Sequence, residues 1–213
     1  MQMKKIILFA TVVILFLVSC KENEDTETPL PKGIFFRGSI QDKNKSITVG
    51  VNGFVDAYFD SVRQNNDTLF FTSGIKLYQG SSGYYISTKE KISFELVNIP
   101  FLNTASNKDS LWHVYLLTQK NIPFYSALIP DSNKSQGFRI RWCDYQGTWY
   151  STSTADQSSA VTIDTTLNTT SGTLSTHQLF ISFEAKLCTK DKTKCIYIKN
   201  GKARIKLYNT SMH

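Results

Sequence analysis

The sequence predicts an all-β protein whose strands form an antiparallel β-sandwich or, alternatively, a lipocalin-like β-barrel, with at most one or two short helices. The first observation is composition: 14 Phe, 10 Tyr and 3 Trp occur among many Thr, Ile and Val, which are favoured on pleated surfaces. The second is pattern: after residue 20, short alternating runs of apolar and polar residues are separated by clusters of Gly, Asn, Asp and Ser. No segment there keeps a helical apolar period over a dozen residues. We therefore expect one β domain over residues 33–213.

In chain order, the alternating runs predict strands at residues 33–40, 47–55, 68–77, 83–87, 91–98, 111–118, 124–128, 137–143, 148–151, 160–163, 178–188, 195–199 and 203–208. Residues 53–63 also fit a short helix, because their apolar side chains lie close to helical spacing. Residues 151–176 are rich in Ser and Thr, and we expect them to form a long, partly mobile loop.

The N-terminal stretch has the organisation of a secretory signal peptide. Lys4 and Lys5 form a short basic region, and residues 6–18 are all apolar except Thr11. This stretch is too short to span a bilayer, but its length suits the apolar part of a signal peptide. It ends in Leu17-Val18-Ser19-Cys20, which resembles the lipobox of bacterial lipoproteins.

The lipobox resemblance implies that residues 1–19 are removed and that Cys20 becomes the lipidated first residue of the mature chain. Each buried methylene of an acyl chain such as palmitate contributes about 0.8 kcal/mol to membrane binding, so several chains give a durable anchor. We therefore expect the membrane to be one partner of this protein, through an N-terminal lipid.

Residues 20–32 are predicted to form a disordered tether. Residues 21–27 contain four acids and one lysine, and Pro29 and Pro31 follow; low hydrophobicity combined with high charge opposes folding. A lysine followed by acids directly after the lipidated cysteine also resembles the surface-export signal of lipoproteins from Bacteroidota. The resemblance implies an outer-membrane protein that faces the cell surface. The alternative is the periplasmic face, with these residues acting only as a solvated spacer.

The charge of the chain is unevenly distributed. The full chain has 24 basic and 17 acidic residues, a net charge of +7. Removing Lys4 and Lys5 leaves 22 basic against 17 acidic residues, and the tether 21–31 holds one base and four acids, so the domain from Lys32 onward carries +8. A basic domain favours polyanionic partners such as acidic glycans or the phosphorylated headgroups of lipopolysaccharide. We do not expect nucleic acid, because the lysines lack interleaved aromatic residues and the compartment is wrong.

The C-terminal strands are the best-specified part of the predicted fold. Asn200-Gly201 is typical of a two-residue type I′ hairpin turn, since both positions need positive φ. Aligning the apolar faces of the neighbouring strands then sets Cys188 opposite Cys195, across the loop 189–194. Because an exported chain folds in an oxidising compartment, we predict a disulfide between these two residues. Cys143 is left as a buried free thiol.

The same segment concentrates positive charge. Its basic residues are Lys186, Lys190, Lys192, Lys194, Lys199, Lys202, Arg204 and Lys206. One hypothesis is an anion-binding face, for which we select Lys192, Lys194, Arg204 and Lys206 as candidate ligand-binding residues. The other is a solvated sheet face, because lysines commonly protect exposed sheet edges from pairing.

Residues 139–150 form the most aromatic cluster of the chain. If residues 144–147 are the loop of a hairpin, Trp142 pairs with Trp149 on a face that belongs to the core. Arg141 and Tyr150 then share the opposite face, where a cation–π contact is favourable, and Tyr145 lies exposed at the tip. Tyr145, Arg141 and Tyr150 are therefore the second group of candidate ligand-binding residues.

No catalytic or metal-binding motif stands out. His113, His177 and His213 are scattered along the chain, so we expect no metal centre, no Ser-His-Asp arrangement and no cofactor. The function we expect is a non-catalytic binding or adhesion module for glycans or other polyanions. The alternatives are a structural envelope component that contacts lipopolysaccharide or a partner protein, and a hydrolase whose two carboxylates lie far apart in the sequence.

Overall fold

The structure is a computed structural model that describes residues 29–49, 53–80, 90–102, 114–126, 136–171 and 174–209. The predicted signal peptide, Cys20, most of the tether and the strand expected at 83–87 lie outside these ranges. All the elements below belong to one compact unit, Pro31–His213. In the described ranges, no helix has the length and apolar character needed to cross a membrane.

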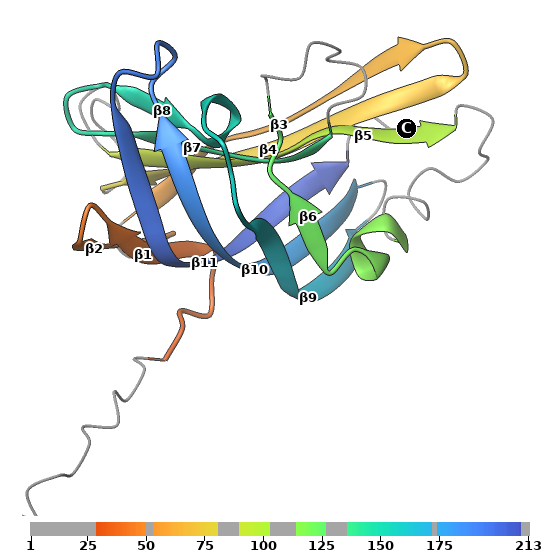
Figure 1. The fold of residues 1–213 in the computed structure, drawn as a ribbon. Helices are drawn as coiled ribbons and strands as arrows, with labels where there is room; N and C mark the ends of the chain where they lie inside the picture. Colours follow the sequence, from red (N-terminus) through yellow and green to blue (C-terminus); the bar gives the residue numbers. More distant parts are fainter. Residues whose placement is uncertain are drawn as a thin grey trace, which may run out of the picture. The chain divides into compact units, whose positions relative to one another are not determined.

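The described strands form one antiparallel sheet, which confirms the all-β prediction (Figure 1). Its main order is β2-β1-β11-β10-β8-β7-β5-β4-β3, while β9 pairs with β10 and with β6. The strands are β1 Phe35–Ile40, β2 Lys43–Thr48, β3 Gly53–Asn65, β4 Thr68–Gln79, β5 Lys91–Leu102, β6 Asn121–Pro123, β7 Gly137–Cys143, β8 Trp149–Ser151, β9 Ala160–Ser171, β10 Leu174–Cys188 and β11 Cys195–Asn209. A 3₁₀ turn, η2 (Thr152–Thr154), follows β8.

The two ends of this order, β2 and β3, approach each other, so the sheet nearly closes into a barrel. Val49 forms an isolated bridge with Gly53 at this seam. A Cβ atom on Gly53 would lie 2.5 Å from Ile47 Cγ2 and 2.5 Å from the Tyr78 carbonyl oxygen. Only glycine fits this close approach of three strands.

Aromatic side chains fill the interior of the sheet. The ring centroids of Phe36, Phe94 and Phe183, from three different strands, lie 5.9–6.4 Å apart. Trp142 packs against Phe36 in the same cluster. Burying one such side chain stabilises the fold by about 1.5–3 kcal/mol. Since side chains pack this interior, the candidate binding surfaces lie on the outside of the sheet.

The predicted disulfide between Cys188 and Cys195 is confirmed. The two residues are direct partners at the end of the β10–β11 pair. The turn between them is ordered around Asp191, whose carboxylate accepts hydrogen bonds from Thr189 Oγ1 and from Thr193. Cys143 is a buried free thiol, as expected.

The predicted hairpin at Asn200-Gly201 is wrong, because β11 runs through both residues. Phe183 pairs with Gly201 and Ala185 pairs with Ile198, so β11 has one residue more than β10 in this interval. This extra residue is a β-bulge. Asn200 has a φ of 51°, and the Phe183 ring packs so closely on Gly201 that a Cβ there would lie 2.6 Å from it. The Asn-Gly pair meets the backbone demands of a bulge as well as those of a turn.

Two other segments differ from the prediction in type. Residues 53–63 belong to β3 and are not helical; the pairing register shifts between Val55 and Ala57, and this bulge produces the irregular apolar spacing that resembled a helix. Residues 114–118 form a helical turn where a strand was expected. In that turn the Thr118 hydroxyl donates to the Val114 carbonyl oxygen over 2.8 Å.

Three segment boundaries also change. The strand expected at 47–55 is divided between β2, which ends at Thr48, and β3. The strand expected at 124–128 is replaced by β6 and an isolated bridge of Phe124 to Phe138. Residues 160–171 of the expected loop 151–176 form strand β9; its many threonines favour strand, because β-branched residues suit pleated surfaces.

Candidate functional site

The basic residues of β11 lie together on the outer face of the sheet. Tyr197 and Lys199 point outward before the bulge, and Lys202, Arg204 and Lys206 do so after it, while Ile198, Ala203 and Ile205 are buried. Because strand side chains alternate between faces, an uninterrupted strand would turn these three later residues inward. The bulge at Asn200 therefore places the outward-facing cations of both halves of the strand on the same face of the sheet.

Neighbouring strands extend this surface. In the register of the sheet, Lys202 lies opposite Arg37 of β1, and Tyr197 lies opposite Lys186 of β10. We call the outer surface formed by these six cations the basic face. Its members are Arg37, Lys186, Lys199, Lys202, Arg204 and Lys206.

The basic face lies in the middle of the sheet and not at its edge. β11 has β1 on one side and β10 on the other, so its lysines do not protect an exposed edge. Glu184 and Asp164 are acids on the same side of the sheet, and Ser182 Oγ donates to Asp164 over 2.6 Å. Asp42, at the β1–β2 turn, pairs with Lys199 over 3.0 Å in an exposed ion pair, and such pairs contribute little.

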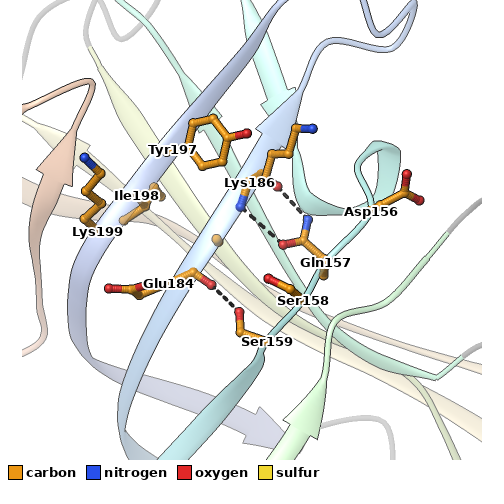
Figure 2. A pocket seen from close by; sticks show the side chains of 10 residues that line it. Asp156, Gln157, Ser158, Ser159, Glu184, Lys186, Tyr197, Ile198 and Lys199 are labelled. Atoms are coloured by element: carbon orange, nitrogen blue, oxygen red, sulfur yellow. Dashed lines mark hydrogen bonds between the residues drawn. The ribbon is translucent and has the colours of Figure 1, made fainter.

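A first hollow opens on the basic face, with a volume of about 450 Å³. Its lining residues are Asp156, Gln157, Ser158, Ser159, Glu184, Ala185, Lys186, Tyr197, Ile198 and Lys199. Figure 2 shows the Tyr197 ring next to Lys186, with Glu184 and Lys199 toward the other end. The Lys186 ammonium lies 6.0 Å from the centre of that ring, and Tyr197 is 53% exposed. The hollow thus combines an accessible aromatic ring with both cationic and acidic side chains.

Side-chain hydrogen bonds fix the wall of the first hollow. β10 is paired by β9 up to Ser182 and by β8 at Cys188, and the segment between is bonded by the chain that precedes β9. Gln157 Nε2 donates to the Lys186 carbonyl over 2.6 Å, and Gln157 Oε1 accepts from the Lys186 amide over 3.2 Å (Figure 2). Ser159 Oγ donates to the Glu184 carbonyl over 2.8 Å. The Gln157 side chain therefore makes the hydrogen bonds to β10 that a neighbouring strand would make. Its segment forms the rim of the first hollow.

A second hollow, of about 350 Å³, lies on the same face. It is lined by Thr165, Leu167, Gln178, Phe180 and Arg204. The Arg204 guanidinium lies 5.8 Å from the centre of the Phe35 ring and 5.9 Å from that of Phe180. It also donates to the carbonyl oxygens of Pro31 and Lys32. These contacts hold a cation in a fixed position beside an apolar wall.

The β7–β8 hairpin differs from the prediction by one residue. Trp142 pairs with Tyr150, and Trp149 pairs with Cys143, so the predicted Trp142–Trp149 pair is wrong. Asp144 causes the difference, because its Oδ1 accepts from the amides of Gln146 and Thr148 over 2.9 Å each and so extends the loop. A one-residue slip exchanges the two faces.

The slip leaves Trp149 39% exposed and buries Tyr150, while Trp142 lies in the core as expected. Tyr150 therefore does not share the outer face with Arg141. Burial, followed by the nearby Asp144 carboxylate, raises the pKa of the Tyr150 hydroxyl. Tyr145 is 67% exposed at the tip of the loop, as predicted.

Around Trp149 the outer sheet carries a second cationic region. The Lys91 ammonium and the Arg141 guanidinium lie 5.5 and 5.6 Å from the centre of the Trp149 ring. We call Lys91, Arg141, Tyr145 and Trp149 the aromatic patch. Beneath it, the fully buried Glu95 carboxylate pairs with Arg141 and also with Arg139.

The predicted site residues thus fall into separate places. Arg204 and Lys206 lie on the basic face, Arg141 and Tyr145 belong to the aromatic patch, and Tyr150 is buried. Lys192 and Lys194 are exposed in the turn between the disulfide cysteines. In that turn, hydrogen bonds from Thr189 and then Thr193 hold the pKa of Asp191 below its ordinary value.

Three important residues were not selected from the sequence. Tyr197 alternates with the buried Ile196 and Ile198, and this alternation could have identified it as an exposed ring. The exposure of Trp149 would have been predicted from a loop one residue longer after Asp144. Glu95 pairs with residues more than 40 positions away, and no local pattern signals that.

Among the residues that the structure describes, no group of three His, Cys, Asp or Glu side chains could hold a metal ion. No protein-family model, no curated protein and no solved structure matches this chain.

Proposed function

We propose that this protein is a non-catalytic binding module that holds acidic polysaccharides on its basic face. The observation that carries the proposal is the bulge at Asn200, which brings the cations of both halves of β11 onto one face in the middle of the sheet. Lys202 lies opposite Arg37 in the sheet register. Two cations at opposed positions concentrate positive charge there, and concentrated positive charge attracts an anionic ligand.

The side chains of the first hollow favour a sugar over a simple anion. An exposed tyrosine ring offers a flat, partly apolar surface, and the Tyr197 ring is suited to the apolar face of a pyranose. Lys186 and Lys199 can pair with a carboxylate or sulfate group. Glu184 and Asp156 can accept hydrogen bonds from sugar hydroxyls. This combination suits an acidic polysaccharide.

We also propose that the protein is displayed on the cell envelope. The support is the lipobox ending at Cys20 and the acidic segment that follows it. We place the protein at the outer membrane, facing outward. The test is incorporation of a palmitate analogue, which a Cys20→Ala variant should lose. Digestion by protease added to intact cells then separates a surface location from a periplasmic one.

Binding is tested on the mature chain carrying Cys20→Ser, which removes the acylated sulfur. The panel contains neutral, uronate and sulfated polysaccharides, and lipopolysaccharide as a phosphate-bearing arm. We expect acidic members to bind, with affinity falling as salt rises, because salt screens exposed charges. Retention of neutral polysaccharides alone would contradict the proposal, and release of shortened sugars would favour the hydrolase alternative.

A pair of double variants locates the binding surface. Lys202→Glu with Lys206→Glu reverses two charges on the basic face and should weaken acidic polysaccharide binding at least tenfold. Lys190→Glu with Lys192→Glu makes the same change of charge in the turn after β10 and is the control. Equal losses in both would mean that net charge, and not the basic face, governs binding.

The aromatic patch supports a second candidate function, contact with a partner protein of the envelope. Trp, Tyr and Arg are enriched among the residues that dominate protein interfaces, and Trp149, Tyr145 and Arg141 supply all three on one hairpin. A Trp149→Ala variant that loses a cross-linked partner but keeps polysaccharide binding would separate the two functions.

A further inference from the structure

We infer that the acidic polysaccharide lies lengthwise along β10 and β11 and occupies both hollows at once, so that recognition has a minimum ligand length. This inference rests on the proposed function and adds to it the form of the ligand. It follows from the position of the hollows, because both open on the basic face and both are lined by β10 and β11.

The register of these strands gives the distance between the hollows. Lys186 pairs with Tyr197 in the first hollow, and Phe180 pairs with Arg204 in the second. Lys186 and Phe180 are six residues apart on β10, whose own course has no extra residue there. At about 3.3 Å per residue, the two hollows lie roughly 20 Å apart. A mono- or disaccharide is too short to reach both.

Cations continue between the hollows. At the intermediate position, Lys202 of β11 pairs with Arg37 of β1 on one side and with Ser182 of β10 on the other. A linear chain with repeated negative charges therefore meets a cation at each end and in the middle. A compact or branched anion cannot make all three contacts.

The two hollows differ in chemistry. The second offers a guanidinium that lies over two phenylalanine rings in contact with each other, together with the side chain of Leu167, which is 54% exposed. It suits a charged group next to an apolar sugar face. The first also contains carboxylates, and it suits a sugar ring with free hydroxyls. Both contacts belong to one ligand. Once one hollow is occupied, the other end of the oligosaccharide is held at a high effective concentration near the second hollow, and the overall affinity rises.

The test uses a size series of linear uronate oligosaccharides, from the disaccharide upward, with the mature Cys20→Ser chain. We expect the dissociation constant to fall at least tenfold at the length that first spans the hollows, and to change little beyond it. A Tyr197→Ala variant perturbs the first hollow, and Leu167→Glu places a negative charge in the second. Each should remove that step for long oligosaccharides.

A matched control exists elsewhere on the chain. Leu117 is 53% exposed in the helical turn, so Leu117→Glu repeats the charge substitution off the basic face. This control should keep the full length dependence. Binding that does not depend on length, or that Leu167→Glu leaves intact for long oligosaccharides, overturns the inference and leaves the proposed function standing. Absence of binding to every acidic polysaccharide, uronate or sulfated, overturns both.

Discussion

The basic face and the aromatic patch contain similar residues but use them differently. In the patch, Arg141 pairs with a carboxylate that is fully buried, and Arg141 and Lys91 lie over the Trp149 ring. On the basic face, the Lys199 partner Asp42 is exposed, and Arg204 binds carbonyl oxygens and aromatic rings. A charge that is neutralised by a buried partner contributes to stability. A charge that is held in place but not neutralised by a buried acid remains available to a ligand.

The largest effect should come from Glu95→Gln. This change leaves Arg139 and Arg141 without their shared carboxylate, and breaking a buried ion pair costs about 3–5 kcal/mol. Since both arginines are partly exposed, we expect the lower end of that range in urea unfolding. Glu184→Gln, on the basic face, is the control and should change stability by less than about 0.5 kcal/mol. Similar losses from both would remove the distinction between the two regions.

Gly201→Ala tests the bulge that organises the basic face. The new Cβ would lie 2.6 Å from the Phe183 ring, and overpacking of this kind costs about 1–3 kcal/mol. Unfolding should therefore occur at lower urea concentration, with weaker polysaccharide binding. Adding Phe183→Leu should make the combined loss smaller than the sum of the two single losses. Strict additivity would show that the ring and the glycine do not interact.

Gln157→Ala tests the rim of the first hollow. The variant loses the amide that bonds both the N–H and the carbonyl of Lys186, so we expect a loss of about 1–2 kcal/mol. Hydrogen exchange at the Lys186 amide should accelerate, while exchange in the β7–β8 hairpin stays the same. Ser158→Ala, an exposed neighbour, is the control. An unchanged Lys186 amide would mean that the rim is not held by Gln157.

The smallest effect concerns the turn between the disulfide cysteines, which belongs to neither region. The pKa of Asp191 is lowered, first by the Thr189 hydroxyl. Its contribution to stability is therefore fully present above the ordinary Asp pKa and is lost as the pH falls through the lowered value. Thr189→Val should raise the Asp191 pKa measured by carbon NMR. No change in that value would show that the hydroxyl bond is absent in solution.

Much of the fold could be predicted from the sequence, because strand alternation and the pairing of adjacent strands depend on residues that are close together in the chain. The Cys188–Cys195 pair is an example, since only a short turn separates its strands. The errors near the candidate residues share one physical cause. A bulge and a two-residue turn both accept Asn-Gly, and an Asp loop can gain one residue, so the sequence did not determine the path of the chain after Asn200 or Asp144. Tyr150 was consequently assigned to the wrong face, whereas Arg204 and Lys206 point outward as expected.

The pairing of β1 with β11 has a consequence for how the chain acquires its structure. The first strand of the sheet finds one of its neighbours at residues 195–209, close to the other end of the chain. Contacts between such distant residues form slowly, because a long loop must close first. A chain that emerges N-terminus first therefore carries β1 and β2 with an open edge until the last strand has been made. The sheet therefore becomes complete only when the whole domain is present.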